Sequence, residues 1–459
     1  MNNEQKELNR LLKLKINKVT DDSRKVENGD IFVAIEGATS DGHDFISNAI
    51  KLGAIAVVYE HGEHVTTKNT TFLKVSDGRE ALAILASSYY NNAHAKMKLI
   101  GITGTNGKTT TAEITYQLLN KIGLKAGLLS TVSAKLPGKA FDTGYHVTTP
   151  NALELHKILN EMYREGCEFI VVETTSHGFD QKRTFGLNFE IGAITNITPE
   201  HLDYHKTFKN YLNAKTSIFE QSNKVILNKY DPSLTEELKK LPKSKSYMIV
   251  DYRELSIPNE FKKRFPGSYN LENAAIAYYI VNDLLGKQDI TILKDLSQVE
   301  GRMEDIPNKK GLRIIIDFAH DDTSLEKILN EVKKVTKGNL IHIFGCAGLR
   351  DTHKRSKMGK ISVKYANKTI ITAEDPRTES LELINKEIVS GIDQNKYMIN
   401  DDYYLIDDRQ EAITFAINTL ALPNDTVLIT GKGHERSMCF GTTERPWSDQ
   451  EAVAKALSF

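Results

Sequence analysis

One segment, residues 98–123, constrains the fold of this 459-residue chain more than any other. It reads KLIGITGTNGKTTTAEITYQLLNKIG, an apolar run followed by a glycine-rich turn and a stretch with helical periodicity. Ile114, Leu118 and Ile122 share one face of that helix, and Gly123 predicts where it ends. A strand, a glycine turn and a helix in this order predict an α/β domain with a largely parallel sheet.

The glycine turn has the chemistry of a phosphate-binding loop. Gly104 and Gly107 let the backbone approach phosphate oxygens, and the helix that follows presents free N–H groups. Lys108 is placed to reach the outer phosphates of a nucleotide, and the hydroxyl of Thr109 or Thr110 to bind Mg²⁺.

The loop departs from the pattern G-x-x-x-x-G-K-[ST], because its first glycine should stand where Ile102 is found. An ordinary glycine turn between a strand and a helix is therefore the alternative. The run Gly-Lys-Thr-Thr in a strand–loop–helix context favours phosphate binding.

Short apolar runs alternate with helical stretches along the whole chain, and this alternation sets the predicted architecture. At about 100–200 residues per domain, the length indicates three domains. We expect an α/β protein with a central P-loop-type mononucleotide-binding domain and a C-terminal Rossmann-like domain. The predicted boundaries are 1–95, 96–300 and 301–459.

Composition excludes several classes of protein. The chain has 60 Lys+Arg and 60 Asp+Glu, so it carries no positive net charge that would favour binding to nucleic acid. No apolar run approaches the roughly 20 residues of a membrane span, and the polar N-terminus has no signal core. Cys167, Cys346 and Cys439 lie far apart, which fits a reducing compartment. We therefore expect a soluble cytoplasmic protein with no nucleic-acid or membrane partner.

Polar residues after two further apolar runs are candidate metal ligands. Glu173 ends the run FIVVE, where a nucleotide-binding domain keeps a Mg²⁺ carboxylate, although a solvated loop cap is the alternative. His201 and His205 in HLDYH are either structural or zinc ligands. Zinc is disfavoured because no third soft ligand or helix-borne Glu follows at the required spacing.

The ordered motifs of the whole chain resemble the Mur ligases. Within that family the chain is most similar to the branch that adds the third stem-peptide residue of peptidoglycan. The motifs that carry the resemblance are DSRKVENGDIFVAIEGATSDGHDF, TGTNGKTT, TTPNALELHKIL, ETTSHG, TNITPEHLDYHKTFKNYLNAKTSIF, GRMED, DFAH, FGCAGLRDTHKR, EDPR and GKGHE.

The resemblance implies four groups of site residues. It places ATP at Gly104, Thr105, Asn106, Gly107, Lys108, Thr109, Thr110, Asn273, Arg302, Asp317 and His320. It places the UDP-sugar at Ser23, Arg24, His43, Thr148, Thr149, Ser176 and Arg183. It places the amino acid at Arg350, Asp375, Pro376, Arg377, Gly431 and Glu435. It places Mg²⁺ at Thr109, Glu173, His201 and a carbamylated Lys215, with Lys108, Lys215 and His201 in catalysis.

Three of these residues have plainer interpretations. The Asp41-Gly42-His43 segment is also a common turn sequence. Thr149, followed by Pro150, is predicted to cap the next helix, a role compatible with substrate binding. Lys215 would be taken from the residues alone for an exposed helix lysine.

The activity implied by the resemblance is an ATP-dependent ligase that works through an acyl phosphate. Its substrates would be UDP-N-acetylmuramoyl-L-alanyl-D-glutamate, ATP and a free diamino acid, and the protein is expected to be a monomer. The alternatives are a lysine-adding enzyme, the ligase that adds a dipeptide, and an ATP-driven switch module.

The third residue of the stem peptide depends on one short motif. Diaminopimelate enzymes of the family carry Asp-Asn-Pro-Arg, and this chain has Glu374-Asp375-Pro376-Arg377. Retention of Arg377 predicts diaminopimelate, because a guanidinium suits a carboxylate. A salt bridge of Arg377 with Glu374 or Asp375 would instead favour lysine. A second departure from the family, His320-Asp321-Asp322, predicts an altered loop after His320.

Overall fold

The computed structural model describes residues 3–37, 40–62, 69–131, 134–136, 139–141, 149–229 and 246–458. Its strands form three larger sheets and one two-stranded ribbon. The chain divides into two compact units, Met1–Ile257 with Glu272–Leu293, and Pro258–Leu271 with Lys294–Phe459. One larger sheet lies within each of the three predicted domains, whose exact boundaries stay predictions.

The first sheet is parallel, with the strand order β1-β2-β3-β4. Its strands are β1 (Val19–Thr20), β2 (Ile31–Val33), β3 (Ala56–Tyr59) and β4 (Thr71–Lys74). Alternate residues of β2 and β3 pack on the two faces. Helices α1 (Asn3–Leu11) and α3 (Gly78–Tyr89) cover one face, and α2 (Ile46–Lys51) covers the other. The short helices η1 (Ser23–Lys25), η2 (Gly42–Phe45) and η3 (Ala93–Lys96) complete this region.

The second sheet has eight strands in the order β12-β11-β10-β5-β9-β6-β7-β8. The six from β12 to β6 are parallel, and β7 and β8 are antiparallel additions at one edge. The strands are β5 (Lys98–Thr103), β6 (Ala126–Leu129), β7 (Ala134–Leu136), β8 (Lys139–Phe141), β9 (Phe169–Glu173), β10 (Phe189–Ile194), β11 (Ser222–Asn228) and β12 (Ser246–Val250).

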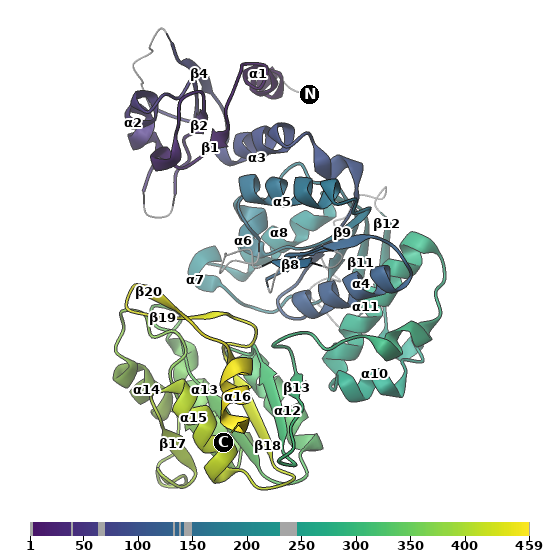
Figure 1. Cartoon of the computed structure of the whole chain (residues 1–459), viewed down its shortest axis with the longest axis vertical. Coiled ribbons are helices and arrows are strands. Elements are labelled where there is room, and N and C mark those ends of the chain that lie inside the picture. The colour runs from purple at the N-terminus through teal and green to yellow at the C-terminus, as the bar shows by residue number, and fades with distance from the viewer. Residues whose placement is uncertain are drawn as a thin grey trace. The chain divides into compact units, whose positions relative to one another are not determined.

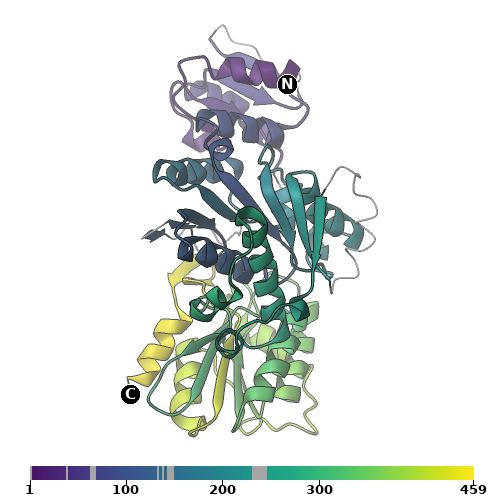
Figure 2. The ribbon, with the colours of Figure 1, turned by 90° about the vertical axis from the view of Figure 1, so that its right-hand side faces the viewer.

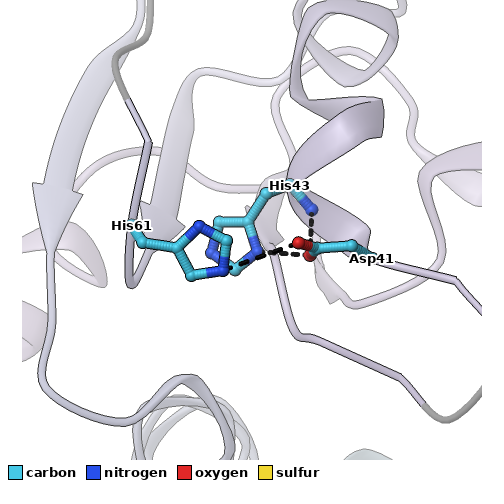
Figure 3. Close-up of side chains that lie close together, drawn as sticks. All are labelled: Asp41, His43 and His61. Atoms are coloured by element: carbon cyan, nitrogen blue, oxygen red, sulfur yellow. Dashed lines mark hydrogen bonds and ion pairs between the residues drawn. The ribbon is translucent and has the colours of Figure 1, made fainter.

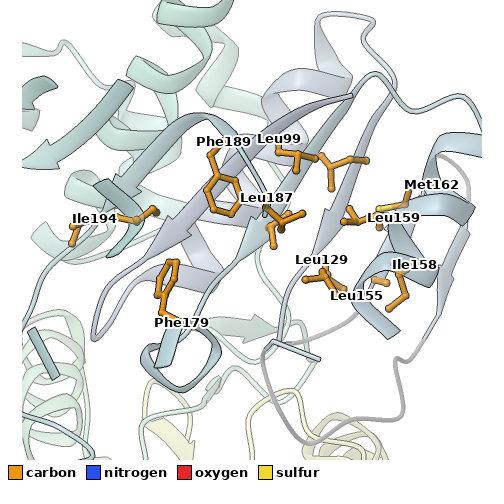
Figure 4. Close-up of a cluster of buried hydrophobic side chains, with 14 of the residues drawn as sticks. Leu99, Leu129, Leu155, Ile158, Leu159, Met162, Phe179, Leu187, Phe189 and Ile194 are labelled. Atoms are coloured by element: carbon orange, nitrogen blue, oxygen red, sulfur yellow. The ribbon is translucent and has the colours of Figure 1, made fainter. Parts of the chain in front are cut away.

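Helices cover both faces of the second sheet. The face towards α5 (Ala152–Arg164) and α8 (Phe208–Thr216) holds a core that includes Leu155, Leu159 and Phe189 (Figure 4). Helix α4 (Lys108–Lys121) lies on the opposite face (Figure 1). It ends before Gly123, whose φ of +85° confirms the predicted stop. The remaining helices of this unit are α6 (Ser176–Asp180), α7 (Leu202–His205), η4 (Ser217–Phe219) and η5 (Tyr252–Glu254).

The predicted cap of helix α5 is wrong by two residues. Asn151 is the N-cap, and its side chain accepts a hydrogen bond from the Glu154 N–H at 2.9 Å. The Thr149 hydroxyl instead contacts the Thr175 hydroxyl at 3.2 Å. The Thr149 side chain therefore bonds to the loop after β9, which is distant in sequence, and does not cap α5.

The third sheet is Rossmann-like, with the order β13-β14-β18-β15-β16-β17 and only β13 antiparallel. Its strands are β13 (Glu304–Ile306), β14 (Arg313–Asp317), β15 (Leu340–Phe344), β16 (Lys368–Ile371), β17 (Tyr403–Leu405) and β18 (Thr426–Thr430). Helices α12 (Asp322–Val335), α13 (His353–Tyr365) and α14 (Leu381–Val389) pack on one face. Helices α15 (Arg409–Phe415) and α16 (Asp449–Leu457) pack on the other, where α16 is the yellow helix in Figure 2.

The remaining described elements include α11 (Ser268–Leu285), whose Asp283 and Glu272 bond to Lys224 and Asn228 of β11. The others are α10 (Asn259–Arg264), η6 (Ile290–Asp295), η7 (Ala416–Leu420) and the ribbon of β19 (Ser437–Phe440) and β20 (Thr443–Pro446). Across the described ranges, every helix is too short or too polar to cross a bilayer.

Candidate active site

The loop between β5 and α4 is held tightly against the segment that follows β10. Gly104 and Gly107 have φ values of +150° and +84°. A Cβ on Gly104 would lie 1.9 Å from the Thr195 hydroxyl oxygen, so no larger residue fits there. The Thr105 N–H donates to the Asn196 carbonyl at 2.7 Å. The close approach explains why glycine is needed in this turn.

Side chains that the sequence did not single out support the loop. The Asn106 N–H donates to Asn196 Oδ1 at 3.0 Å, and the Thr105 hydroxyl lies 2.7 Å from the Tyr211 hydroxyl. A Cβ on Gly107 would lie 2.3 Å from Asn273 Oδ1, so the predicted ATP residue Asn273 lies against the loop. Neutral groups thus contribute to the shape of the loop.

Lys108 is the first residue of α4 and folds back over the loop. Its ammonium donates to the carbonyls of Gly104 at 3.0 Å and Thr105 at 2.7 Å. It forms no ion pair with any residue that the structure describes. The positive end of the helix and this ammonium together make a region suited to phosphate oxygens.

Glu173 ends β9, as predicted, and its carboxylate is buried beside α4. Glu173 Oε1 accepts hydrogen bonds from the hydroxyls of Thr109 at 3.1 Å and Thr131 at 3.0 Å. Oε2 accepts from the Thr131 N–H at 3.0 Å. Sequence reasoning missed Thr131, although it follows an apolar strand beside the loop. Thr110 is buried on the same helix.

Lys215, on α8, is buried rather than exposed, with 2% of its surface accessible. Its amine donates to the Gly104 carbonyl at 2.6 Å and lies 4.7 Å from the centre of the Tyr211 ring. Burial, reinforced by the positive charge of Lys108, lowers the pKa of Lys215 well below its ordinary value. A lowered pKa shifts this amine toward its neutral, nucleophilic form.

His201 belongs to a cluster of rings next to α7. It has a φ of +53°, and its Nε2 lies 3.7 Å from Glu200 Oε2. Its ring centre is 4.9 Å from that of His177, which also contacts His205 at 5.4 Å. The structure therefore groups His201 with the Glu200 carboxylate before it and with histidines of the ETTSHG and HLDYH segments.

The predicted sugar-binding residues of the second sheet lie around the loop after β9. The Arg183 guanidinium donates to the Thr149 carbonyl and, at 2.7 Å, to Gln181 Oε1. The Ser176 hydroxyl is buried and has no hydrogen-bond partner among the described residues. Thr148 lies outside the described residues.

Asp41, His43 and His61 form a compact group at the edge of the first sheet (Figure 3). His43 Nδ1 lies 2.6 Å from Asp41 Oδ1, and His43 Nε2 accepts the Glu60 N–H at 3.0 Å. Nδ1 therefore carries the proton. A metal bound to Nδ1 would move that proton to Nε2. The Nε2–H would then face the Glu60 N–H, so two donors would oppose each other. The geometry favours a hydrogen-bonded turn over a metal site.

The other predicted residues of the first sheet lie nearby in η1. Ser23 is buried. Arg24 is exposed, and its guanidinium donates from Nε and Nη2 to the Asp22 carboxylate, each at 2.9 Å. These bonds lower the pKa of Asp22 to about 2.

Arg302 and His320 contact the Phe318 ring in the second unit, and Asp317 is the residue before it. Asp317 accepts two backbone N–H bonds, both at 2.8 Å, and burial raises its pKa. The Arg302 guanidinium lies 4.6 Å from the Phe318 ring centre, and His320 Nδ1 lies 3.0 Å from the Phe318 carbonyl. Asp321 caps α12, so the departure from the family motif after His320 has a structural use.

Arg377 and Asp375 lie in the loop after β16 and do not pair with each other. Asp375 Oδ1 accepts bonds from Lys432 Nζ and the Cys439 N–H, both at 2.9 Å. The Arg377 guanidinium has no ion pair within the described part of the chain. The salt bridge of Arg377 with Glu374 or Asp375 is therefore absent there.

Lys432, which sequence reasoning missed, organises the predicted amino-acid site. It is 1% exposed, and its Nζ lies 2.9 Å from Asp375 Oδ1 and 2.5 Å from Glu435 Oε2. A Cβ on Gly431 would lie 2.5 Å from Glu374 Oε2. Burial raises the pKa of Glu374 from 4.5 to about 7, against the opposing effect of nearby cations.

The remaining predicted residues of this site flank the same loops. Arg350 is exposed, and Pro376 is buried. The structure thus brings the EDPR and GKGHE motifs together through Lys432.

A parallel α/β sheet with a glycine loop leading into a helix defines the class of phosphate-loop mononucleotide-binding proteins. Comparison with known families narrows this class. Residues 15–90 match the Mur ligase family, catalytic domain; residues 102–281 match the Mur ligase middle domain; and residues 301–433 match the Mur ligase, glutamate ligase domain. The chain belongs to the Mur ligase family.

Characterised relatives align over nearly the whole chain. The UDP-N-acetylmuramoyl-L-alanyl-D-glutamate--2,6-diaminopimelate ligase of Clostridium botulinum is 37% identical, covering 92% of this chain and 91% of the relative. The protein of that name from Clostridium perfringens is 38% identical, covering 96% and 95%.

Solved structures share the fold. A UDP-N-acetylmuramoyl-L-alanyl-D-glutamate--2,6-diaminopimelate ligase aligns with a TM-score of 0.63 and 26% identity over 96% of this chain and 95% of that one. The MurF ligase from Thermotoga maritima in complex with ADP aligns with a TM-score of 0.62 and 20% identity over 97% of each chain. The family resemblance and the α/β fold class expected from the sequence are confirmed.

Proposed function

We propose that this chain is an ATP-dependent ligase that joins meso-diaminopimelate to UDP-N-acetylmuramoyl-L-alanyl-D-glutamate. The observation that carries the proposal is the phosphate loop, where the amines of Lys108 and Lys215 both donate to the Gly104 carbonyl. Relatives more than 35% identical that carry the diaminopimelate ligase name support the choice of substrates.

ATP binding rests on the start of α4. Its free N–H groups and the Lys108 ammonium suit the outer phosphates, which carry the charge that moves during phosphoryl transfer. The predicted roles of Arg302, Asp317 and His320 in ATP binding stay predictions.

Mg²⁺ would be held by Glu173 and the Thr109 hydroxyl, since carboxylate and hydroxyl oxygens are the ligands that this ion prefers. A lysine ammonium is not a ligand, but the neutral amine of Lys215 can add to CO₂. The new N–C bond gives a carbamate anion, and the amine releases one proton. The lowered pKa of Lys215 supports this modification, and His201 stays a predicted further ligand.

The reaction needs an activated carboxyl group. The γ-phosphoryl group of ATP passes to a carboxylate oxygen of the glutamyl residue, which gives an acyl phosphate and ADP. The amine of the incoming amino acid attacks the acyl carbon, loses a proton, and phosphate leaves as the amide forms. Lys108 and the helix N–H groups stabilise the charge that develops on the transferring oxygens. Bound Mg²⁺ would neutralise phosphate charge.

The amino-acid side of the reaction is assigned to the loops around Lys432. Arg377, which has no carboxylate partner among the described residues, suits the distal carboxylate of diaminopimelate. Glu435 and Asp375 both bind Lys432, and their negative charge suits an ammonium group of the incoming amino acid. Arg350, Pro376 and Gly431 stay predicted contacts.

The UDP-sugar is assigned to the predicted residues of the first and second sheets. The buried Ser176 hydroxyl, which lacks a partner among the described residues, supports this assignment. Ser23, Arg24, His43, Thr148, Thr149 and Arg183 stay predicted contacts. The cytoplasmic location and the monomeric state are likewise part of the proposal.

A substrate panel tests the proposal. The full chain is incubated with ATP, Mg²⁺, the UDP-muramoyl-dipeptide and diaminopimelate, lysine or D-Ala-D-Ala, and product masses are read directly. We expect the diaminopimelate adduct with one ADP per product. A dipeptide adduct would indicate the other ligase, and ADP release without any acceptor would indicate a switch module.

A further inference from the structure

Two loops of the second unit each hold a residue in a strained backbone conformation. Leu349, in the loop between β15 and α13, has a φ of +55°, and Arg377, in the loop between β16 and α14, has a φ of +54°. Residues other than glycine rarely adopt this left-handed conformation, and they do so only where surrounding contacts hold them. Leu349 precedes Arg350, so both strained positions involve predicted amino-acid contacts.

Arg355, at the start of α13, joins these two loops. Its side chain is fully buried, and it makes a forked pair with Glu379, with Nη1 at 2.6 Å from Oε1 and Nη2 at 2.9 Å from Oε2. Nη2 also donates to the Ala347 carbonyl at 3.0 Å. Glu379 Oε2 in turn accepts the Leu349 N–H at 2.9 Å. One guanidinium thus bonds to the first loop directly and, through Glu379, to both loops.

The loops also touch through their backbones. The Gly348 N–H donates to the Asp375 carbonyl at 2.8 Å, and a Cβ on Gly348 would lie 2.0 Å from the Pro376 carbonyl oxygen. This close contact requires the backbones of the two loops to keep a fixed position relative to each other. The pair of Arg355 and Glu379 bonds to Ala347 and Leu349, the residues before and after Gly348, and so holds this contact in place.

We propose that Arg355 is a positioning residue that sets the spacing between Arg350 and Arg377, and thereby the affinity for the incoming amino acid. The inference rests on the proposed function, since that function places the amino acid at these loops. A planar guanidinium is required because two parallel bonds to Glu379, with further bonds to Ala347 and to Glu387 at 3.0 Å, fix direction as well as distance. A lysine keeps the charge and loses the fork.

Arg355→Lys is the test variant, and Arg313→Lys is its matched control. Arg313 makes a similar forked pair with Asp305 between β13 and β14, away from both loops, at 3.0 Å and 2.8 Å. For Arg355→Lys we expect KM for diaminopimelate to rise roughly 10–100-fold, because small misplacements of binding groups have effects of this size. KM for ATP and the control variant should stay within about twofold of wild type.

Hydrogen exchange and direct binding supply readouts that a general loss of stability would not reproduce. In Arg355→Lys, amides of residues 347–350 and 375–379 should exchange faster while those of β15 and β16 keep their protection. Calorimetric titration with diaminopimelate should show a matching loss of affinity. If Arg355→Lys fails to fold, Glu379→Gln, which keeps the shape and loses the charge, should raise the same KM selectively.

The inference and the proposed function fail in different ways. A wild-type protein that forms no tripeptide product and binds no diaminopimelate would overturn both. An active wild type whose Arg355→Lys and Glu379→Gln variants keep a normal KM for diaminopimelate would overturn the inference alone. An equal rise of KM for ATP and for diaminopimelate would also overturn it, because that result describes general damage.

Discussion

The phosphate loop of the first unit and the amino-acid loops of the second are held in shape by different chemistry. Neutral groups such as Thr105, Asn196 and Tyr211 hold the phosphate loop without an ion pair. The amines of Lys108 and Lys215 add hydrogen bonds to its backbone carbonyls. Charged pairs hold the amino-acid loops, with Arg355 on Glu379 and Lys432 on Asp375. Arg409, which forms a fully buried pair with Asp449, donates from its guanidinium to the Thr430 carbonyl at 2.9 Å, next to Gly431.

The difference follows from what each region has to bind. Phosphate oxygens carry several negative charges, so a loop that binds them must keep its cations away from protein carboxylates. An amino acid brings both charges, so its site needs carboxylates and cations in a defined arrangement. In each region one cation, Lys108 or Arg377, has no ion-pair partner among the described residues.

Lys108→Ala should have the largest effect, because it removes from the phosphate loop the cation that has no ion-pair partner among the described residues. We expect kcat to fall roughly 100–1,000-fold, the usual result of removing one group that stabilises developing charge. The melting temperature should be unchanged, because among the residues that the structure describes the ammonium bonds to just two loop carbonyls. Steady-state ADP formation measures the effect, and Lys121→Ala at the exposed end of α4 is the control. Near-normal turnover would contradict phosphate binding by this loop.

Lys215→Ala should have the second largest effect. We expect its activity to fall by more than the roughly 10–100-fold that is typical when a group supporting a metal ligand is removed. Formate or acetate should restore part of the activity, because a small carboxylate can occupy the place of the carbamate. Lys215→Arg, which stays cationic and cannot be carbamylated, should show no such rescue. Intact mass at neutral pH in bicarbonate should reveal CO₂ on the wild type. Full activity of Lys215→Arg would refute the carbamate.

Arg377→Ala tests whether the guanidinium in the amino-acid loops recognises the distal carboxylate of the incoming amino acid. Wild type should prefer diaminopimelate to lysine, because lysine leaves the guanidinium without a partner. Loss of one member of a desolvated charge pair costs about 2–5 kcal/mol, so the preference should fall at least roughly thirtyfold in the variant. Relative kcat/KM for the two amino acids measures it. A wild-type preference for lysine that survives in Arg377→Ala would exclude carboxylate recognition by this residue.

Glu374→Gln should have the smallest effect, on stability rather than rate. The pKa of Glu374 is raised in the folded state from 4.5 to about 7. The stability that the protonated carboxyl contributes is therefore fully present below pH 4.5 and is lost as the pH rises through about 7. Between about pH 5 and about pH 8, the melting temperature of wild type should fall a few degrees more than that of the variant. If the melting temperatures of wild type and Glu374→Gln change with pH in parallel, the titrating group is not Glu374.

Much of the phosphate-loop region was predictable because its determinants are local. The glycines, the lysine and the threonines of GITGTNGKTT act within one strand–turn–helix unit, and Gly123 ends the helix through its own backbone conformation. The position of Glu173 at the end of β9 follows from the apolar run before it. The cap of α5 was mispredicted because Thr149 has a partner at Thr175, which no local rule includes.

The sequence by itself therefore determined the α/β class, the phosphate loop and the family of this protein. Only the tertiary structure decided the burial of Lys215, whose bond to the Gly104 carbonyl joins residues 111 positions apart. It also decided that Thr131 supports Glu173, that Lys432 links Asp375 to Glu435, and that the Arg377 guanidinium has no ion-pair partner among the described residues. The reason is physical. A backbone conformation depends on near neighbours in the chain, whereas burial and ion pairing depend on which distant segments the sheet brings together.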